Sequence, residues 1–149
     1  MKLATWNVNS LNVRLPRLLG WLEATSPDVV CLQETKLEDV KFPHDVLREA
    51  GYEAHFAGQK TYNGVAIIVR KELAAGDIVR GMPGYEDTQQ RVIAATVAGI
   101  RIICVYVPNG QTVGSDKYVY KLGWYHAAAQ YAKAALAQHP RLAMLGDFN

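Results

Sequence analysis

Residues 29–36 read VVCLQETK, a run of four apolar residues that passes directly into an amide, a carboxylate and an amine. The apolar residues are β-branched or compact, as in a strand that is covered on both faces. At the end of such a strand the side chains leave the core and reach the crevice where open α/β sheets place their ligands. Glu34 is therefore a candidate ligand for a hard cation such as Mg²⁺, although a Glu that caps a loop or pairs with Lys36 would give the same pattern.

Length and charge limit the classes of protein that fit. A chain of 149 residues with 50% hydrophobic content suits one domain with a substantial core. The net charge is only +2, which excludes a protein that coats nucleic acid through a general excess of positive charge. Any contact with nucleic acid must then depend on where individual charges lie.

Both cysteines, Cys31 and Cys104, lie within apolar runs, and we interpret them as buried structural thiols of a reducing compartment. Residues 1–10 contain no apolar run of signal-peptide length, and no segment reaches the roughly 20 apolar residues that cross a bilayer. We therefore expect a cytoplasmic protein without a membrane segment.

The patterns along the chain predict strands alternating with helices. Apolar residues that alternate along 2–9 predict a strand, and a helical stripe predicts a helix over 13–24 with Pro16 in its first turn. Turn signals at 63–64 and 98–99 predict two hairpins, and residues 81–90 read as a loop. The other predicted elements are a short helix from Phe42-Pro43 to Gly51, strands at 52–57 and 142–145, and a helix before Pro140 with Leu122, Tyr125, Ala129, Ala132 and Leu136 on its buried face. Together they indicate an α/β fold with a mixed sheet.

Polar residues follow four of the apolar strands. Asn7 ends the first strand, Glu34 follows the second, Tyr106 and Asn109 follow the second hairpin, and Asp147 with Asn149 follows the last. If these strands share an edge, their polar groups converge, and such a set of carboxylates and amides suits a metal ion and a phosphoryl group. Taken singly, such residues are more often turn or packing residues.

Five motifs occur in order along the chain: TWNVNSLNVR, LQETK, YNGVAII, YVPNG and GDFN. In this combination the chain resembles the exonuclease III family of DNA-repair nucleases, within the endonuclease/exonuclease/phosphatase superfamily. The resemblance implies a four-layer α/β sandwich, in which two mixed β-sheets pack face to face with helices outside. On this basis residues 1–149 are the N-terminal portion of one such domain.

The resemblance also implies a role for individual residues. Glu34 resembles the family's Mg²⁺ ligand and Asn7 the amide that supports the metal site, with Mn²⁺ as an alternative ion. Tyr106 resembles the tyrosine at the scissile phosphate, Asp147 the carboxylate that orients the attacking water, and Asn149 the amide that holds a phosphate oxygen. Four further positions resemble residues that approach the DNA: Lys36, Asn63, Arg91 and Asn109.

The implied reaction is in-line hydrolysis of a phosphodiester. In the family the substrates are double-stranded DNA with abasic sites or 3′ ends, and the products carry a 3′-hydroxyl. We expect the complete protein to be a monomer that does not associate with membranes.

The chain departs from the family pattern after GDFN, because similar proteins continue into a further Asp-containing loop and a Ser-Asp-His motif. None of His44, His55, His126 and His139 lies in such a motif, and we interpret all four as surface or packing residues. These 149 residues would then supply one sheet and the start of the other. Without the histidine that completes the site we expect this stretch to be inactive alone. An uncovered apolar sheet face would make it poorly soluble, and a sharp cooperative melt would contradict that expectation.

Two alternatives stay open. A non-catalytic module of the same fold would bind DNA with strong salt dependence and would not cleave it. A superfamily phosphatase or phosphodiesterase would act on inositol phosphates or lipids, although LQETK and YVPNG argue against it.

Overall fold

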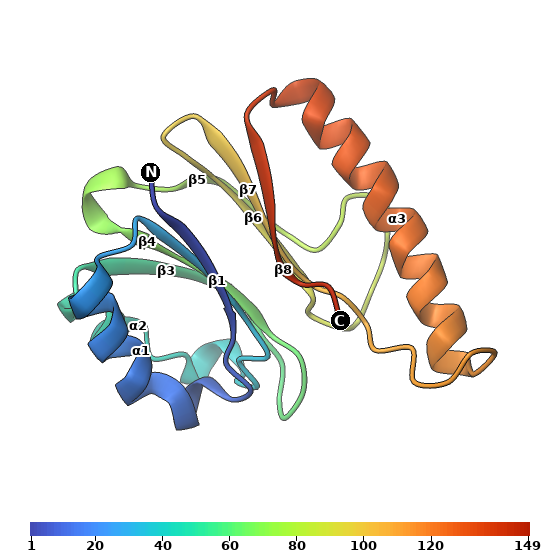
Figure 1. The fold of residues 1–149 in the computed structure, drawn as a ribbon, viewed down its shortest axis with the longest axis horizontal. Helices are drawn as coiled ribbons and strands as arrows, with labels where there is room; N and C mark the ends of the chain where they lie inside the picture. Colours follow the sequence, from blue (N-terminus) through green and yellow to red (C-terminus); the bar gives the residue numbers. More distant parts are fainter.

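The computed structural model describes residues 1–149 as two four-stranded sheets packed face to face, with helices on both outer sides (Figure 1). Sheet A has the strand order β1-β2-β4-β3, formed by Leu3–Asn7, Val29–Gln33, Val65–Arg70 and Tyr52–Ala57. Sheet B has the order β5-β6-β7-β8, formed by Gly76–Arg80, Val92–Val97, Ile100–Tyr106 and Leu142–Asp147. The helices are α1 (Leu11–Thr25), α2 (His44–Glu49) and α3 (Asp116–Gln138), with short 3₁₀ turns at Asp39–Lys41 and Lys71–Leu73.

Three apolar clusters hold these four layers together. The first joins α1 and α2 to the outer face of sheet A, through residues such as Leu22 and Ile68. The second fills the space between the sheets, where Cys31 and Cys104 are both buried free thiols. The third packs Trp124 of α3 against the outer face of sheet B. Alternate residues of the central strands therefore face two different cores, and this explains why these strands read as continuous apolar runs.

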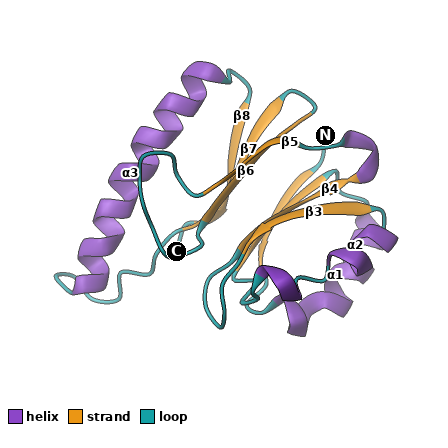
Figure 2. Cartoon of the chain, turned by 180° about the vertical axis from the view of Figure 1, so that it is seen from behind, coloured by secondary structure: helices purple, strands orange, loops and turns teal.

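The direction of the strands determines where polar groups gather. Strand β1 runs parallel to β2, and β7 runs parallel to β8. The carboxyl ends of each parallel pair therefore lie at one edge of their sheet. Strands β1 and β8 are edge strands of different sheets and lie side by side across the sandwich (Figure 1). Figure 2 shows the two sheets from behind, with α3 outside one and α1 and α2 outside the other. The ends of all four strands thus meet at one place.

The predicted fold class is confirmed, and most predicted elements are present. The turn at Ala98-Gly99 has φ values of 49° and 76°, as the tight hairpin between β6 and β7 requires. Helix α2 follows Pro43, and Gly51 lies just beyond its end with a φ of 94°. Residues 81–90 contain no helix or extended strand, as predicted. No helix of the chain is long and apolar enough to cross a membrane.

Four expectations were wrong. Strand β5 was not predicted, because GDIVR is short and only half-buried at the sheet edge. Pro16 lies in the interior of α1 and not in its first turn. Proline cannot make the usual backbone hydrogen bond there, and the burial of Leu18 and Leu22 offsets this loss. Both sheets are present and cover each other's inner faces, so neither inner face is left without a partner.

The predicted buried face of α3 was also wrong. Leu122 and Leu136 are 51% and 54% exposed, whereas Trp124, Ala128 and Ala135 are buried. Helix α3 is rich in apolar residues all around, so its periodicity does not select one face. The large indole of Trp124 and two small alanines fit the surface of sheet B, and this shape decides which side faces inward.

The packing of β8 on β7 leaves no room for a side chain at Gly146. A Cβ atom there would overlap the carbonyl oxygen of Val105 on the neighbouring strand. We expect Gly146→Ala to lower the free energy of unfolding by about 3 kcal/mol, because backbone atoms would have to move apart. Chemical denaturation measures this difference.

Gly123→Ala is the matched control, because a Cβ atom at this position of α3 meets nothing within 4 Å. This control should stabilise the protein by about 1 kcal/mol through helix propensity alone. Equal stability of the two variants would contradict the close approach of β8 to β7.

Candidate active site

The ends of β1, β2, β7 and β8 bring one amide, two carboxylates and one phenol into direct contact. The side-chain amide of Asn7 donates to Glu34 Oε1 at 3.0 Å and to Asp147 Oδ2 at 2.7 Å. The hydroxyl of Tyr106 donates to the same Glu34 oxygen at 2.8 Å. Asn7, Tyr106 and Asp147 are each the last residue of a strand. The predicted convergence of polar strand ends is therefore present in the structure.

A strained turn carries Glu34 from the end of β2 into this cluster. Glu34 and Lys36 have φ values of 53° and 57°, in the left-handed region that costs a non-glycine residue about 1 kcal/mol. Backbone hydrogen bonds from Thr35 to Gly64 and from Lys36 to Asn63 fasten the turn to the loop before β4. The Ser10 and Leu11 amides donate to the carbonyl groups of Glu34 and Thr35 from the other side. The surrounding backbone thus holds the Glu34 carboxylate in a defined place.

Hydrogen bonds help to determine the protonation states of Glu34 and Tyr106. Burial alone would raise the pKa of Glu34, but hydrogen bonds from Asn7 and Tyr106 and the charge of Lys36, 3.4 Å from its other oxygen, lower this pKa overall. Burial and the bond to the Glu34 carboxylate raise the pKa of Tyr106 to about 12. At neutral pH the cluster thus holds an anionic Glu34 and a protonated Tyr106 that donates to it.

Asp147 is positioned from two sides. Its Oδ2 accepts from Asn7, and its Oδ1 accepts the backbone amide of Asn149 at 2.8 Å. The Asn149 side chain donates to the carbonyl of Val107 at 3.2 Å. In this structure Asn149 therefore orders the segment that carries Asp147, while its predicted contact with a phosphate oxygen stays a prediction.

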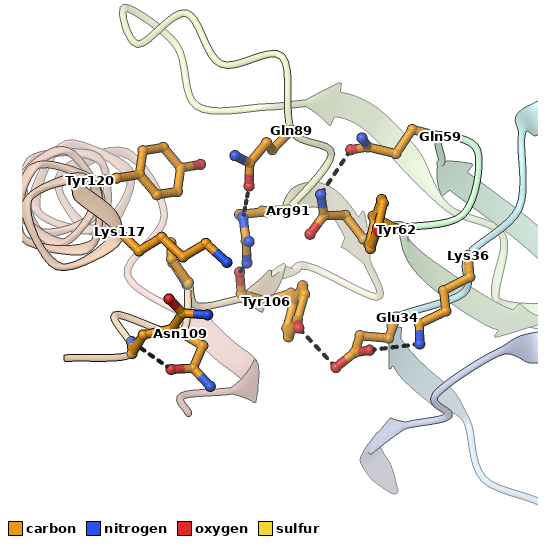
Figure 3. A pocket seen from close by; sticks show the side chains of 13 residues that line it. Glu34, Lys36, Gln59, Tyr62, Gln89, Arg91, Tyr106, Asn109, Lys117 and Tyr120 are labelled. Carbon is orange, nitrogen blue, oxygen red and sulfur yellow. Dashed lines mark hydrogen bonds and ion pairs between the residues drawn. The ribbon is translucent and has the colours of Figure 1, made fainter. Parts of the chain in front are cut away.

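A pocket of about 500 Å³ opens beside the Glu34 carboxylate (Figure 3). It contains all four predicted DNA-contacting residues, Lys36, Asn63, Arg91 and Asn109, together with Tyr106. Three of its lining residues are cationic and Glu34 is its only acidic one. The sequence did not point to five other lining residues: Gln59, Gln89, Gln111, Lys117 and Tyr120.

Arg91 is the centre of this pocket in Figure 3. Its Nε donates to Gln89 Oε1 at 2.9 Å and its Nη1 to the backbone carbonyl of Tyr106 at 3.1 Å. Its guanidinium also lies over the rings of Tyr106 and Tyr120, at 4.7 and 5.8 Å from their centroids. Arg91 therefore holds Tyr106 in place as well as supplying positive charge.

Helix α3 supplies the far wall of the pocket through Lys117 and Tyr120. The Tyr120 hydroxyl donates to Asp87 Oδ2 at 2.6 Å, which fastens the helix to the loop before β6. Burial and this hydrogen bond raise the pKa of Tyr120, so its hydroxyl stays protonated. In the sequence nothing separates Lys117 and Tyr120 from other polar residues of a helix. Tyr62, which also lines the pocket, had a signal in the sequence, its place in the YNGVAII motif.

The donor set of the cluster suits a hard cation. Glu34, Asp147 and the carbonyl of Asn7 are all oxygen donors, which Mg²⁺ prefers. No group of three His, Cys, Asp or Glu residues in the chain could hold a metal ion. Mg²⁺ needs few protein ligands because it keeps several waters and binds substrate phosphates, so the residues present fit it.

Fold and site together define a two-sheet α/β protein whose carboxylates and amide lie beside a basic pocket. The chain belongs to the Endonuclease/Exonuclease/phosphatase family, whose model matches residues 4–149. Among curated relatives it is 32% identical over 155 residues to exodeoxyribonuclease III of Haemophilus influenzae, covering 100% of this chain and 57% of the relative. The resemblance to the exonuclease III family is therefore confirmed.

Solved structures agree with this assignment. The 3′ phosphatase NExo from Neisseria, bound to a product DNA hairpin, matches with a TM-score of 0.97 and 46% identity over 100% of this chain and 58% of its own. An AP endonuclease from Archaeoglobus fulgidus matches with a TM-score of 0.90 and 37% identity over 99% of this chain and 57% of its own. The chain thus spans less than two thirds of the length of these relatives.

Removal of the Asn7 side chain tests the cluster. Asn7→Ala leaves the two carboxylates facing each other without their shared donor, and we expect the free energy of unfolding to fall by about 2 kcal/mol at neutral pH. Chemical denaturation without added metal ions measures this loss. Asn12→Ala, on the exposed side of α1, should change stability by less than about 0.5 kcal/mol. An unchanged Asn7→Ala stability would contradict the bridging role of the amide.

Proposed function

We propose that this chain is the N-terminal portion of a Mg²⁺-dependent DNA-repair phosphodiesterase. Its substrates are duplex DNA with abasic sites or 3′ ends, and its products carry a 3′-hydroxyl. The observation that supports this most is the contact of Asn7 with both Glu34 and Asp147, next to a pocket lined by three cationic residues. The names of the relatives, exodeoxyribonuclease III, 3′ phosphatase and AP endonuclease, agree in substrate class.

Each residue of the cluster has one task in this proposal. Asp147, held by Asn7 and by the Asn149 amide, orients the attacking water and accepts its proton. Tyr106 stays protonated at neutral pH because its pKa is about 12, and on substrate binding its hydroxyl turns from Glu34 to donate to a phosphate oxygen. The amide of Asn149 assists at a second phosphate oxygen. These donors stabilise the charge that develops in the transition state.

Glu34 and Asn7 would hold the metal ion. When bound, Mg²⁺ or Mn²⁺ supplies positive charge that offsets the charge of the phosphate. Lys36, Asn63, Arg91 and Asn109 contact the DNA backbone from the pocket, with Lys117 as a further cation. A local strip of this kind is sufficient for phosphate contacts despite the small net charge.

Removal of a terminal 3′-phosphate is a second candidate activity. The specific observation is the 46% identity to the 3′ phosphatase NExo over the whole of this chain. The chemistry is the same attack of water on phosphorus, and only the leaving and flanking groups differ. In this proposal the preference between an internal phosphodiester and a terminal 3′-phosphate depends on how far a DNA end enters the pocket.

The proposal is tested with the full-length protein and three duplex oligonucleotides, which carry an internal abasic site, a 3′-phosphate or a 3′-hydroxyl. With Mg²⁺ we expect cleavage or phosphate release that leaves a 3′-hydroxyl, and none with EDTA. Glu34→Gln and Asp147→Asn should each lower the rate by at least about 100-fold. Asp45→Asn is the charge-matched control, since this exposed residue lies outside the pocket and should keep the rate.

The outcome also separates the alternatives. Salt-dependent DNA binding without cleavage in Mg²⁺ would indicate the non-catalytic module. Cleavage of inositol phosphates or lipids in preference to DNA would indicate the other superfamily activity.

Arg91 provides a test that separates positioning from charge. Arg91→Lys keeps the positive charge but loses the second hydrogen bond and the stacking on Tyr106. We expect kcat to fall about 10-fold while the salt dependence of DNA binding is retained. Lys117→Arg, which changes a cation of the same pocket that makes no such contact, should leave kcat within about 2-fold. Equal effects of the two variants would contradict a positioning role for Arg91.

A further inference from the structure

A second pocket, of about 780 Å³, lies on the outer side of sheet B between α3 and the β5 edge. It shares no lining residue with the pocket beside Glu34. Its walls contain no acidic side chain: they are formed by Val79, Pro83, Gly84, Tyr85, Arg101, His126, Ala127, Gln130, Tyr131, Ala134, Ala135, Gln138 and His139. His126 and His139, interpreted from the sequence as surface or packing residues, thus lie at this pocket.

Arg101 of β7 places a buried positive charge at this pocket. The residue is only 6% exposed. Its Nη1 donates to the backbone carbonyl of Asp77 at 2.7 Å and to Thr96 Oγ1 at 3.1 Å. Both acceptors are neutral, and Arg101 takes part in none of the ion pairs of the chain. A buried charge without a counter-charge costs several kcal/mol, and buried charges in proteins are therefore normally paired.

Tyr131 adds a second unsatisfied group to the same pocket. Its hydroxyl oxygen is buried, and the protein offers no acceptor for its proton. Burial raises the pKa of Tyr131, an effect that the charge of Arg101 and a hydrogen bond from its guanidinium only partly oppose. The hydroxyl therefore stays protonated at neutral pH and is available as a donor. A guanidinium without a counter-ion and a phenol without an acceptor can both donate hydrogen bonds to a negatively charged oxygen.

We propose that this pocket binds a small organic anion, whose phosphate or carboxylate head contacts Arg101 and Tyr131. Arginine presents paired donors that match the two oxygens of either head group. The rest of the wall is largely apolar or aromatic, with the Tyr85 ring and three alanines of α3, so it suits a flat, weakly polar body. A volume of about 780 Å³ lies in the range of pockets for small ligands.

The lining of this pocket argues for a site of its own. Its residues come from β5, β7, the loop at 83–85 and the second half of α3, and none comes from β1 or β8. The residues of α3 at the first pocket, Lys117 and Tyr120, belong to the first half of the helix. Binding here therefore does not depend on the phosphodiesterase proposal.

Calorimetric titration of the full-length protein with inorganic phosphate, benzoate and a nucleoside 5′-monophosphate tests the proposal. We expect saturable binding of at least one of them, with the nucleotide tighter than phosphate because it also contacts the apolar wall. Phenyl phosphate has the same ring as benzoate and is titrated beside it, so tighter benzoate than phenyl phosphate would assign a carboxylate head, and the reverse order a phosphate head. Arg101→Gln should weaken binding by at least about 10-fold, and Tyr131→Phe by about 3- to 10-fold. Should Arg101→Gln fail to fold by circular dichroism, the Tyr131→Phe result decides.

Two controls locate the binding. Lys133→Gln removes one charge from α3 outside the pocket, and Lys117→Gln removes one from the first pocket. Both should leave the affinity within about 2-fold. Absence of saturable binding up to about 10 mM, or affinity lost in Lys117→Gln and retained in Tyr131→Phe, would overturn the proposal. In that event Arg101 only fastens Asp77 and Thr96.

Discussion

One amide group connects the two halves of the sandwich at the place where chemistry is proposed. Asn7 belongs to sheet A and Asp147 to sheet B, and the Asn7 side chain reaches Asp147 at 2.7 Å while also contacting Glu34 at 3.0 Å. Two carboxylates so close repel each other unless a donor lies between them. The amide supplies two N–H groups without adding charge, and its carbonyl oxygen accepts the backbone amide of Asn9 at 3.0 Å. The separation of the sheets therefore determines the spacing of the site.

The strands hold the functional groups of the site at nearly fixed distances from one another. Each functional group stands at or just beyond the last residue of a strand whose other residues are packed in a core, so it inherits the rigidity of that core. Arg91 contacts both Tyr106 and Tyr120, and it thereby connects the end of β7 to α3. Local strain at Glu34 is compatible with this design, because backbone hydrogen bonds from two neighbouring segments hold the turn.

The sequence predicted the convergence of the polar strand ends better than it predicted the packing. Polar residues after apolar strands, such as Asn7 and Glu34, carry a local signal because a strand end is visible in sequence. Lys117 and Tyr120 carry no such signal, since only the docking of α3 brings them to the pocket. The buried face of α3 was predicted wrongly because apolar residues surround that helix and only shape complementarity selects Trp124. The second sheet was underestimated because β5 is a short edge strand, which tertiary pairing stabilises more than its own residues do.

The contact between Asn7 and Asp147 joins positions 140 residues apart. Loop-closure entropy makes such a distant contact late and slow to form, compared with the hairpin of β6 and β7. During synthesis on a ribosome, β1 emerges first and its last residue must wait for nearly the whole of this chain before its partner exists. The nascent chain therefore cannot assemble the carboxylate pair early, and until β8 docks the Asn7 amide has only Glu34 as a partner.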